Sequence, residues 1–339
     1  MTTLLAIESS CDETAAAVVV DGRRMLSNVV ASQAELHSES GGVVPEVAAR
    51  QHVRALLPVV RRALEEAECS WDRIDAIAAT AGPGLPGALV VGLNAARGIA
   101  YARGLPFIPT DHIEGHVCAN WLGPEEPPLP ALALVVSGGH TELLLMEDHG
   151  HFERLGGTRD DAAGEAFDKV ARLLDLGYPG GPPISRLAAT ATERTLKLPR
   201  AWLRGSDDFS FSGLKTAVAR LVSGEDGPVP PPAEVAWAFE ESVVDVLSRK
   251  AARVAEREGV GALLVAGGVA ANRRLREVVR ERSPVPVFIP EPVLCTDNAA
   301  MIGAAAWRHL DEAVPPESSL DIHPTVKRDP RALARAGRR

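Results

Sequence analysis

The amino-acid sequence predicts an α/β fold in which one unit of secondary structure occurs twice. Residues 4–7 are apolar, a polar turn follows at 8–14, and residues 15–20 are apolar again, which is the pattern of two strands joined by a turn. The same plan returns far down the chain, with apolar residues at 131–136 and 143–146 around a small polar turn. The spacing between the copies is too long for a solenoid and favours two facing copies of one α/β unit.

The remaining segments alternate between strand and helix, as this fold class requires. Asp21-Gly22 is a strong hairpin signal after the second apolar run. A Pro-rich connector at 123–130 is a plausible junction between domains, and the helices within about 160–256 predict a helical insertion in the second half. The other predicted strands are 74–80, 106–109 and 262–266, and the predicted helices are 47–69, 88–103, 162–176, 183–191, 233–258, 271–280 and 298–310.

Length and composition set the broad class of protein. A chain of 339 residues with 46% hydrophobic and 24% charged residues is typical of a folded protein of about two domains. The formal net charge of −9 argues against a protein that coats nucleic acid by bulk charge. That average hides a local exception, because the tail at 327–339 carries six basic residues and one acid.

The sequence also predicts a soluble, cytoplasmic protein. None of the four cysteines belongs to a Cys-x-x-Cys pair, so neither a zinc knuckle nor a disulfide framework is indicated. The first residues lack the basic start and cleavable apolar segment of a signal peptide. No uninterrupted apolar run reaches the roughly 18 residues that a bilayer span needs.

Three Gly-rich turns point to a bound nucleotide or phosphate. SGGHT at 137–141 lies between two predicted strands, YPGGP at 178–182 between helices, and GGVAAN at 267–272 between a strand and a helix. Such turns bring backbone N–H groups close to an anion, although a single one often marks only a turn that needs positive φ. None is a Walker A loop or a GxGxxG fingerprint, which disfavours a Rossmann dinucleotide fold.

The segment HIEGH at 112–116 is a candidate metal site. On a helix, His112 and His116 stand about one turn apart on the same face and can bind one metal ion. Glu114 then points away from that face, so the arrangement lacks the general base of a zinc protease. The alternative is a pair of solvated or capping histidines.

Asp297 is the best candidate for a third metal ligand. It lies in CTDN at 295–298, at the start of the last predicted helix. Two imidazoles and one carboxylate would form a site with open positions, as in non-haem iron and some zinc sites. A role for Asp297 as the N-cap of that helix is about equally compatible with the sequence.

Two acidic segments complete the set of candidates. In DDAAGEAFDK at 160–169, Asp160 or Asp161 is available to cap the predicted helix, and Asp161 and Asp168 share one face. The acids of ESSCDET at 8–14 suit Mg²⁺ coordination or the orientation of water near phosphates. The alternatives are capping acids on a solvated face and an acidic hairpin loop.

Eight segments together resemble the motifs of one family. They are ESSCDETA at 8–15, AGPGLPG at 81–87, HIEGH at 112–116, VVSGGHT at 135–141, AGEAFDK at 163–169, YPGGP at 178–182, GGVAAN at 267–272 and CTDNAAM at 295–301. The family they resemble is the bacterial catalytic subunit of tRNA threonylcarbamoyladenosine biosynthesis, formerly described as O-sialoglycoprotein endopeptidase. The resemblance spans about residues 4–303, and SGGHTE has the bacterial form of a motif that tends to read SGGNTQ in archaea and eukaryotes.

The resemblance implies an actin-like fold of two lobes, shared with sugar kinases and heat-shock ATPases. Residues 1–108 would form the first lobe, completed by the C-terminal helical region 298–326. Residues 109–297 would form the second lobe, including the helical insertion at about 160–256, and residues 327–339 would be a basic tail. The duplicated strand–turn–strand unit agrees with this expectation.

The activity implied by the resemblance is a group transfer to tRNA. The threonylcarbamoyl group would pass from threonylcarbamoyl-adenylate to the amino nitrogen of the adenosine next to the anticodon, in tRNAs that read ANN codons. His112, His116 and Asp297 would hold a metal ion, namely Fe²⁺, with Zn²⁺ or Mg²⁺ as substitutes in vitro. The candidates for catalytic proton transfer are Asp12, Glu13 and His140, and the residues expected to bind the adenylate are Val135, Val136, Ser137, Gly138, Gly139, Asp168, Gly181 and Asn272.

The resemblance also implies partners, namely tRNA, a shorter actin-like paralogue and a small P-loop ATPase, and no membrane. The helix at 47–69 is a candidate interface, although its apolar face is equally compatible with a core. Because the chain is acidic outside its tail, we expect weak tRNA binding that partner subunits supplement and that depends strongly on salt.

Three other functions remain open at this point. A small-molecule kinase or ATPase of the same fold would use the Gly-rich loops but gives no reason for HIEGH with Asp297. A metalloendopeptidase would need Glu114 as its base. A non-catalytic module that binds nucleotide only to assemble a complex is disfavoured, because both histidines and Asp297 are present.

Overall fold

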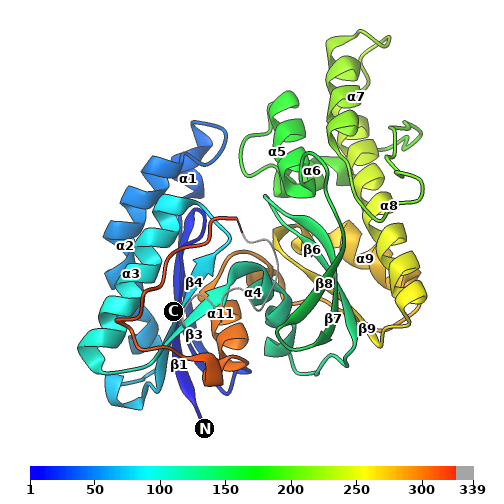
Figure 1. The fold of residues 1–339 in the computed structure, drawn as a ribbon. Coiled ribbons are helices and arrows are strands. Elements are labelled where there is room, and N and C mark those ends of the chain that lie inside the picture. The colour runs from blue at the N-terminus through cyan, green and yellow to red at the C-terminus, as the bar shows by residue number, and fades with distance from the viewer. Residues whose placement is uncertain (326–339) are drawn as a thin grey trace.

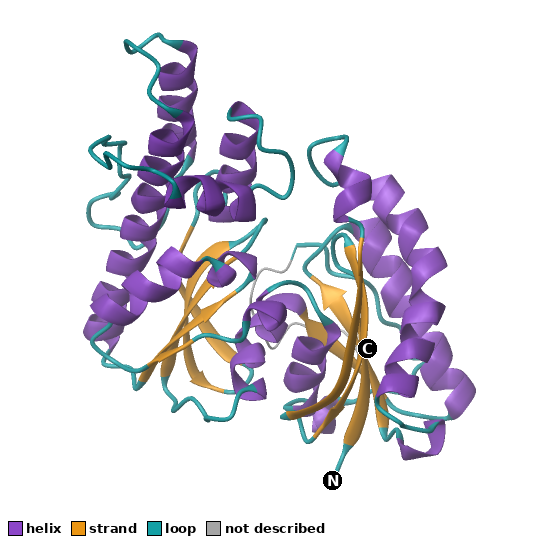
Figure 2. Ribbon diagram, turned by 180° about the vertical axis from the view of Figure 1, so that it is seen from behind, coloured by secondary structure: helices purple, strands orange, loops and turns teal. Residues whose placement is uncertain are grey.

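The computed structural model describes residues 1–325, which form two five-stranded sheets flanked by helices (Figures 1 and 2). The two sheets lie side by side, with α4 and α11 between them and most other helices on their outer sides. Within residues 1–325, no helix combines the length and the apolar character needed to cross a membrane. The predicted basic tail at 327–339 lies outside the described residues.

The first sheet has the strand order β3-β2-β1-β4-β5. β1 pairs antiparallel with β2 and parallel with β4. β2 turns back into β3 through Asp21 and Gly22, which both have positive φ, so the predicted hairpin is confirmed. The strands are β1 (Thr3–Glu8), β2 (Glu13–Val20), β3 (Arg24–Ser32), β4 (Ala76–Gly82) and β5 (Phe107–Asp111).

Helices cover both faces of the first sheet, and this explains why its central strand is a continuous apolar run. Leu5 and Ile7 of β1 face a core that α2 and α3 complete, whereas Leu4 and Ala6 face a core that α11 completes. The short helix α1 precedes α2. These helices are α1 (Ala34–Ser38), α2 (Pro45–Glu66), α3 (Pro86–Arg103) and α11 (Ala299–Trp307).

The second sheet repeats the plan of the first. Its order is β10-β9-β6-β7-β8, and its central strand β6 pairs antiparallel with β7 and parallel with β9, as β1 does with β2 and β4. The predicted duplication of one α/β unit is therefore confirmed. The strands are β6 (Ala131–Val136), β7 (Thr141–Asp148), β8 (His151–Gly157), β9 (Ala262–Ala266) and β10 (Val287–Phe288).

Four helices lie in sequence between β8 and β9 and form the predicted helical insertion. Their core joins Leu132 and Leu134 of β6 to Phe167 and Phe239 of the helices. The sequence did not predict α7, whose N-terminal amides are held by Asp160: its Oδ1 accepts from the N–H of Phe211 at 2.8 Å. The helices of this half are α5 (Ala163–Leu173), α6 (Gly181–Ala189), α7 (Ser212–Ser223), α8 (Pro232–Glu258), α9 (Arg273–Arg282) and α10 (Pro292–Cys295).

Helix α4 (His112–Cys118) lies at the junction of the two halves. It follows β5 directly, and its Ile113 and Val117 pack in one core with Val135 and Leu264 of the second sheet. Its other neighbour is α11, which lies against the first sheet. The side chains of α4 therefore lie between the second sheet and α11, which packs on the first sheet.

Candidate active site

The two histidines of HIEGH lie on one face of α4, as predicted. Asp111 starts the helix, because its Oδ1 accepts from the N–H groups of Ile113 and Glu114 at 2.7 and 2.9 Å. His112 and His116 are both buried, and their ring centroids lie 4.7 Å apart at an interplanar angle of 74°. The cap and the helical period therefore aim two imidazoles at one point.

Asp297 completes a cluster of three potential metal ligands. Its Oδ1 lies 3.1 Å from Nε2 of His116 and 3.6 Å from Nε2 of His112, and the ligand atoms of all three residues lie within 4.8 Å of one another. The cap of α11 is Asn298, whose side chain accepts from the N–H of Met301 at 3.0 Å. The N-cap alternative for Asp297 is therefore wrong.

The donor set fits a divalent metal ion. Both ring nitrogens of His116 are buried and neither makes a well-aligned hydrogen bond among residues 1–325, although Nε2 lies 3.1 Å from Asp297 Oδ1, so Nε2 and this carboxylate are placed to bind one ion together. Two imidazole nitrogens with one carboxylate are typical of Fe²⁺ and Zn²⁺ sites. The family-implied metal thus has a plausible set of ligands in the described residues.

A buried carboxylate stands behind the first histidine. Glu8 is fully buried at the end of β1, and its Oε2 lies 3.0 Å from Nδ1 of His112 and accepts from the hydroxyl of Thr80 at 2.7 Å. A carboxylate at Nδ1 holds the proton there and leaves Nε2 facing Asp297. The sequence analysis missed this role for Glu8, although ESSCDET drew attention to the segment.

Without a metal ion, opposite charges dominate the electrostatics of this cluster. Burial alone would lower the pKa of His112, but the Asp297 and Glu8 carboxylates prevail and raise it to about 9. Burial would raise the pKa of both carboxyls, and the histidines overcome it, so the pKa values of Glu8 and Asp297 lie below their usual range. The carboxylates of Glu8 and Asp297 therefore favour a positive charge between them.

Glu114 takes no part in this cluster. Its Oε1 lies 2.8 Å from Nε2 of His309, on the far side of α4, and both side chains are largely buried. The structure thus confirms that Glu114 points away from the face of α4 that carries His112 and His116. A zinc peptidase would need a base at the metal, and Glu114 is not placed to serve as one.

The acids at the first turn and at the start of β2 lie close to the cluster of His112, His116 and Asp297. Burial, followed by the nearby Asp297 and Asp12 carboxylates, raises the pKa of Glu13 to about 10. Glu13 is therefore a carboxyl that carries a proton at neutral pH when no metal ion is bound. His140 lies near enough to Asp297 to help lower its pKa.

Asp168 holds the turn at 178–182 rather than facing outward. Its Oδ1 accepts from the N–H of Gly180 at 2.7 Å, and burial raises its pKa. Asp161 lies before α5 and contacts Lys169 at 2.7 Å. The N-cap of α5 is Ala162, so the prediction that Asp160 or Asp161 caps this helix is wrong.

The turn after β6 leaves its glycines open. The N–H of Ser137 donates to the carbonyl of His140 at 2.8 Å, and the carbonyl of Ser137 accepts from Gly164 at 3.1 Å, which fixes the turn. Gly138 and Gly139 are exposed, with no atom within 4 Å of the position a Cβ would take. Val135 and Val136 are fully buried in β6, so any contact they make with a ligand must come from the backbone.

The other two Gly-rich turns lie at the same end of the second sheet. Gly267 follows β9, the parallel neighbour of β6, with φ of 89°, and a Cβ there would lie 2.4 Å from the carbonyl oxygen of Val136. Gly181 is the first residue of α6 and has open space where a Cβ would be. Helix N-termini and open glycine amides are favourable for a phosphate.

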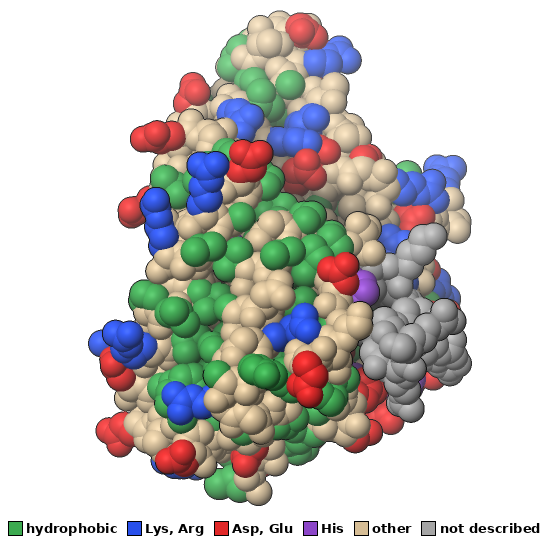
Figure 3. All heavy atoms as spheres, turned by 60° about the vertical axis from the view of Figure 1, so that its left-hand side comes forward, with side chains coloured by type: hydrophobic (Ala, Val, Ile, Leu, Met, Phe, Trp, Pro, Cys, Tyr) green, Lys and Arg blue, Asp and Glu red, His purple; other side chains and the backbone are tan. Residues whose placement is uncertain are grey.

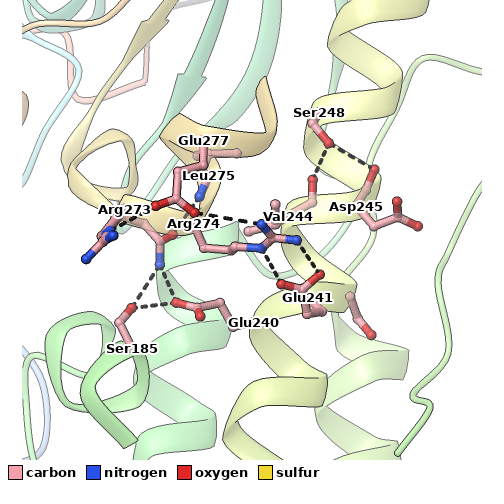
Figure 4. A network of polar contacts seen from close by, with 12 residues as sticks. Ser185, Glu240, Glu241, Val244, Asp245, Ser248, Arg273, Arg274, Leu275 and Glu277 are labelled. Carbon is pink, nitrogen blue, oxygen red and sulfur yellow. Dashed lines mark hydrogen bonds and ion pairs between the residues drawn. The ribbon is translucent and has the colours of Figure 1, made fainter. Parts of the chain in front are cut away.

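Asn272 uses most of its hydrogen-bonding capacity within the protein. Its Nδ2 donates to Ser185 Oγ at 2.9 Å and to Glu240 Oε1 at 2.7 Å, and its Oδ1 accepts from the N–H of Leu275 at 2.8 Å. Figure 4 labels the partners Ser185, Glu240 and Leu275. The sequence analysis missed Ser185 and Glu240, which lie on α6 and α8. A ligand that contacts the Asn272 amide would compete with both of them.

Comparison with solved structures agrees with the two-lobed plan. Component A of (R)-2-hydroxyglutaryl-CoA dehydratase from Acidaminococcus fermentans is similar over 92% of this chain and 100% of its own, with a TM-score of 0.56 and 16% identity. Full-length HypF is similar over 94% of this chain and 47% of its own, with a TM-score of 0.61 and 13% identity. The fold is that of the actin-like ATPases, and at these identities the likeness shows the fold alone.

Sequence relatives are far closer. Proteins named tRNA N6-adenosine threonylcarbamoyltransferase match at 51% identity in Thermomicrobium roseum, over 98% of this chain and 99% of the relative, and at 53% in Dehalococcoides mccartyi, over 95% and 98%. The relative from Bacillus cereus is 52% identical over 95% of this chain and 96% of its own. The family model of tRNA N6-adenosine threonylcarbamoyltransferase matches residues 24–304. The chain belongs to this family of tRNA-modifying transferases.

Proposed function

We propose that this chain transfers the threonylcarbamoyl group from threonylcarbamoyl-adenylate to the amino nitrogen of the adenosine next to the anticodon, in tRNAs that read ANN codons. The observation that carries the proposal is the convergence of His112, His116 and Asp297 beside three Gly-rich turns. A metal centre next to an anion-binding surface suits a donor that has both a carbamoyl carbonyl and a phosphate.

The proposed metal is iron, held by His112, His116 and Asp297. When bound, it would supply a Lewis acid for the carbamoyl carbonyl or the threonyl carboxylate. Glu8 would keep the proton of His112 on Nδ1, and its buried contact with Thr80 keeps the carboxylate in place. The burial of His116, with its Nε2 3.1 Å from Asp297 Oδ1, supports this assignment.

The donor's phosphate would bind across the Gly-rich turns. The open positions at Gly138, Gly139 and Gly181 allow close approach of an anion to the backbone. Asp168, by holding Gly180, would position the turn that precedes α6. We propose that Val135, Val136, Ser137 and Asn272 hold the Gly-rich turns in the conformation that binds the phosphate.

Asp12, Glu13 and His140 would move or hold the proton that leaves the adenosine amine. Glu13 is the candidate to hold this proton rather than to accept it as a base, because its pKa, raised to about 10, keeps the carboxyl protonated at neutral pH. The adenosine amine is a weak nucleophile, so positioning by both lobes would supply much of the reduction of the barrier.

The proposed protein partners are a shorter actin-like paralogue and a small P-loop ATPase, in the cytoplasm. Apolar side chains gather on the outer face of α2 and α3 (Figure 3), where Val53, Leu57 and Val90 are 66%, 61% and 44% exposed. A groove of about 570 Å³ continues this face between Leu57, Trp71 and Ile99. Exposed apolar helices of this kind fit the matching helices of a related lobe, so Leu57→Asp should abolish co-purification with the paralogue.

The deciding experiment combines the chain and its partners with threonylcarbamoyl-adenylate and unmodified tRNA that reads ANN codons. Mass spectrometry of the digested tRNA should show threonylcarbamoyladenosine. A complete lack of product from the wild-type assembly would refute the proposed function. Unchanged yield from His112→Ala would refute the metal assignment alone.

A further inference from the structure

Arg276 lies in the first turn of α9, and its side chain reaches back beyond the start of that helix. The helix is capped by Asn272, whose Oδ1 accepts from the N–H of Leu275 at 2.8 Å. Side chains on a helix lean toward its N-terminus, so the guanidinium of Arg276 is directed at the residues that lead into α9. Those residues are GGVAAN at 267–272, one of the three Gly-rich turns.

The guanidinium of Arg276 donates to two segments that α9 and β10 separate in the sequence. Its Nε donates to the carbonyl of Ala270, within the Gly-rich turn, at 2.7 Å. One of its terminal nitrogens donates to the carbonyl of Pro290 at 2.5 Å and to Sγ of Cys295 at 3.1 Å. A guanidinium is planar and holds its N–H groups in fixed directions, so these contacts set both the distance and the orientation between the two segments.

The second segment leads directly to the metal ligand Asp297. Cys295 ends α10, and only Thr296 separates it from Asp297. On the other side, Asn298 caps α11, and its Nδ2 donates to the carbonyl of Thr296 at 2.8 Å. Asp297 is therefore held between two fixed neighbours, and Arg276 is the link that ties one of them to α9.

The first segment belongs to the surface proposed to bind the donor's phosphate. Gly267 approaches β6 so closely that a Cβ there would lie 2.4 Å from the carbonyl oxygen of Val136. Within the turn, the N–H of Ala270 donates to the carbonyl of Gly267 at 2.8 Å. The carbonyl that Arg276 holds is thus part of a turn fixed against the second sheet. A change at Arg276 would therefore alter the position of this turn relative to Asp297.

Neighbouring arginines of α9 make a different kind of contact. Arg274 pairs with Glu241 of α8, with 3.2 Å between its Nη2 and Oε2 (Figure 4). Arg282 contacts Asp245 of the same helix at 2.7 Å. Arg276 instead donates to two main-chain carbonyls and one sulfur atom. Its contacts therefore set the geometry of the chain around it, whereas those of Arg274 and Arg282 pair opposite charges.

We propose that Arg276 is a positioning residue that fixes the Gly-rich turn at 267–272 relative to the metal ligand Asp297. The inference rests on the proposed function, in which one donor places its phosphate on the Gly-rich turns and its carbamoyl end beside Asp297. Both ends of that donor must fit at once, so the spacing of the two segments decides how the carbamoyl carbon is presented for attack. An error of about 1 Å in the placement of a reacting group can cost about 100-fold in rate.

The test compares Arg276→Gln with Arg274→Gln, a matched control on the same helix. The full-length chain is titrated with Fe²⁺ against a chelator, without donor or tRNA, and its assembly with the partners is assayed for the KM of threonylcarbamoyl-adenylate. Arg276→Gln should weaken Fe²⁺ binding about tenfold and raise this KM severalfold, because one link holds both segments. Arg274→Gln should change neither quantity, since its contact is with α8.

Arg276→Lys separates geometry from charge. A lysine keeps the positive charge but lacks the planar fork of N–H groups, so this variant should behave like Arg276→Gln. Wild-type Fe²⁺ affinity and KM in Arg276→Lys would overturn the proposal. A change in only one of the two quantities in Arg276→Gln would overturn it as well.

Cys295→Ala keeps the proposal falsifiable if the Arg276 variants fail to fold. It removes one acceptor of the guanidinium and leaves α9 unchanged, so it should weaken Fe²⁺ binding severalfold. Unchanged Fe²⁺ affinity in this variant would overturn the proposal. A wild-type assembly that makes no threonylcarbamoyladenosine by mass spectrometry would refute the proposed function, whereas the Fe²⁺ titration still decides the role of Arg276.

Discussion

The two sheets share one topology but put different chemistry in the turn that follows their central strand. After β1, the turn ends with Asp12 and is followed by Glu13, the first residue of β2, and Glu8 at the end of β1 faces His112. After β6, the equivalent turn holds Gly138 and Gly139, with open space around them. One copy of the unit thus attracts positive charge, and the other offers backbone N–H groups to negative charge. The two turns therefore differ in charge although the strands around them follow one topology.

The comparison also separates two ways of building a site. The cluster of Glu8, His112 and Asp297 relies on buried charges that must be compensated, and these three residues shift each other's pKa. The second lobe relies on main-chain geometry, such as the approach of Gly267 to Val136. Substitutions in this charged cluster should therefore change metal binding and local charge. Substitutions in the Gly-rich turns of the second lobe should change the backbone conformation of those turns.

The largest effect is expected from Asp297→Ala. Losing the shared carboxylate should reduce bound metal to background and product formation by about 1000-fold, because several kcal/mol of Lewis-acid stabilisation disappear. Elemental analysis of the preparation measures the bound metal, and mass spectrometry of the tRNA measures product formation. Glu114→Gln is the matched control, since Glu114 faces His309, and it should retain the metal.

The next effect concerns pH and the His309–Glu114 pair. Burial would lower the pKa of His309, but Glu114 prevails and raises it to about 9. Because the unfolded value is near 6.5, the stabilisation is complete below about pH 6.5 and is lost as pH rises through 9, by at most about 3 kcal/mol. Chemical unfolding from pH 6 to 9.5 should show this loss in the wild type and in His151→Gln, and a smaller loss in His309→Gln, in which His112 still has a pKa raised to about 9. A wild type with flat stability across the window would disprove the pairing.

Glycine substitutions test the second lobe. Gly267→Ala should lower the free energy of unfolding by about 2 kcal/mol, because the residue has positive φ and a Cβ would meet the Val136 carbonyl. Gly138→Ala should leave stability within about 0.5 kcal/mol, since its surroundings are open, while raising the KM for the donor. Equal stability losses at both positions would contradict the distinction between framework and ligand-facing glycines.

The smallest effect is expected from Glu8→Gln. The amide oxygen can still accept from Nδ1 of His112, so only the charge is lost, and metal affinity should fall about tenfold. Glu8→Leu removes the acceptor as well and should weaken the metal further. Competition with a metal chelator measures both. Wild-type metal affinity in Glu8→Leu would show that Glu8 does not contribute to metal binding.

The sequence was informative where local patterns decide structure. β9 was predicted at 262–266 and is found at Ala262–Ala266, and the helical period alone placed His112 and His116 on one face. The polar strand β8 (HFERLGG) was missed, because it lies at the sheet edge and has no clear alternation of apolar residues. Periodicity identifies elements that bury one side, and an edge strand buries little.

Long-range contacts explain what the sequence could not reveal. Asp160 was expected to cap the next helix, but it binds residues about fifty positions later, at the start of α7. Glu8 meets Thr80 and His112 only because β1, β4 and β5 are neighbours in the sheet. The pairing of strands creates these contacts, and no spacing within one segment encodes them.

The most direct test of the central claim is a metal titration of demetallated wild-type protein in the complete reaction. Threonylcarbamoyladenosine should be absent at the start and should rise until one metal ion per chain is bound, with no rise for Asp297→Ala. Full product yield from the demetallated protein would contradict the central claim.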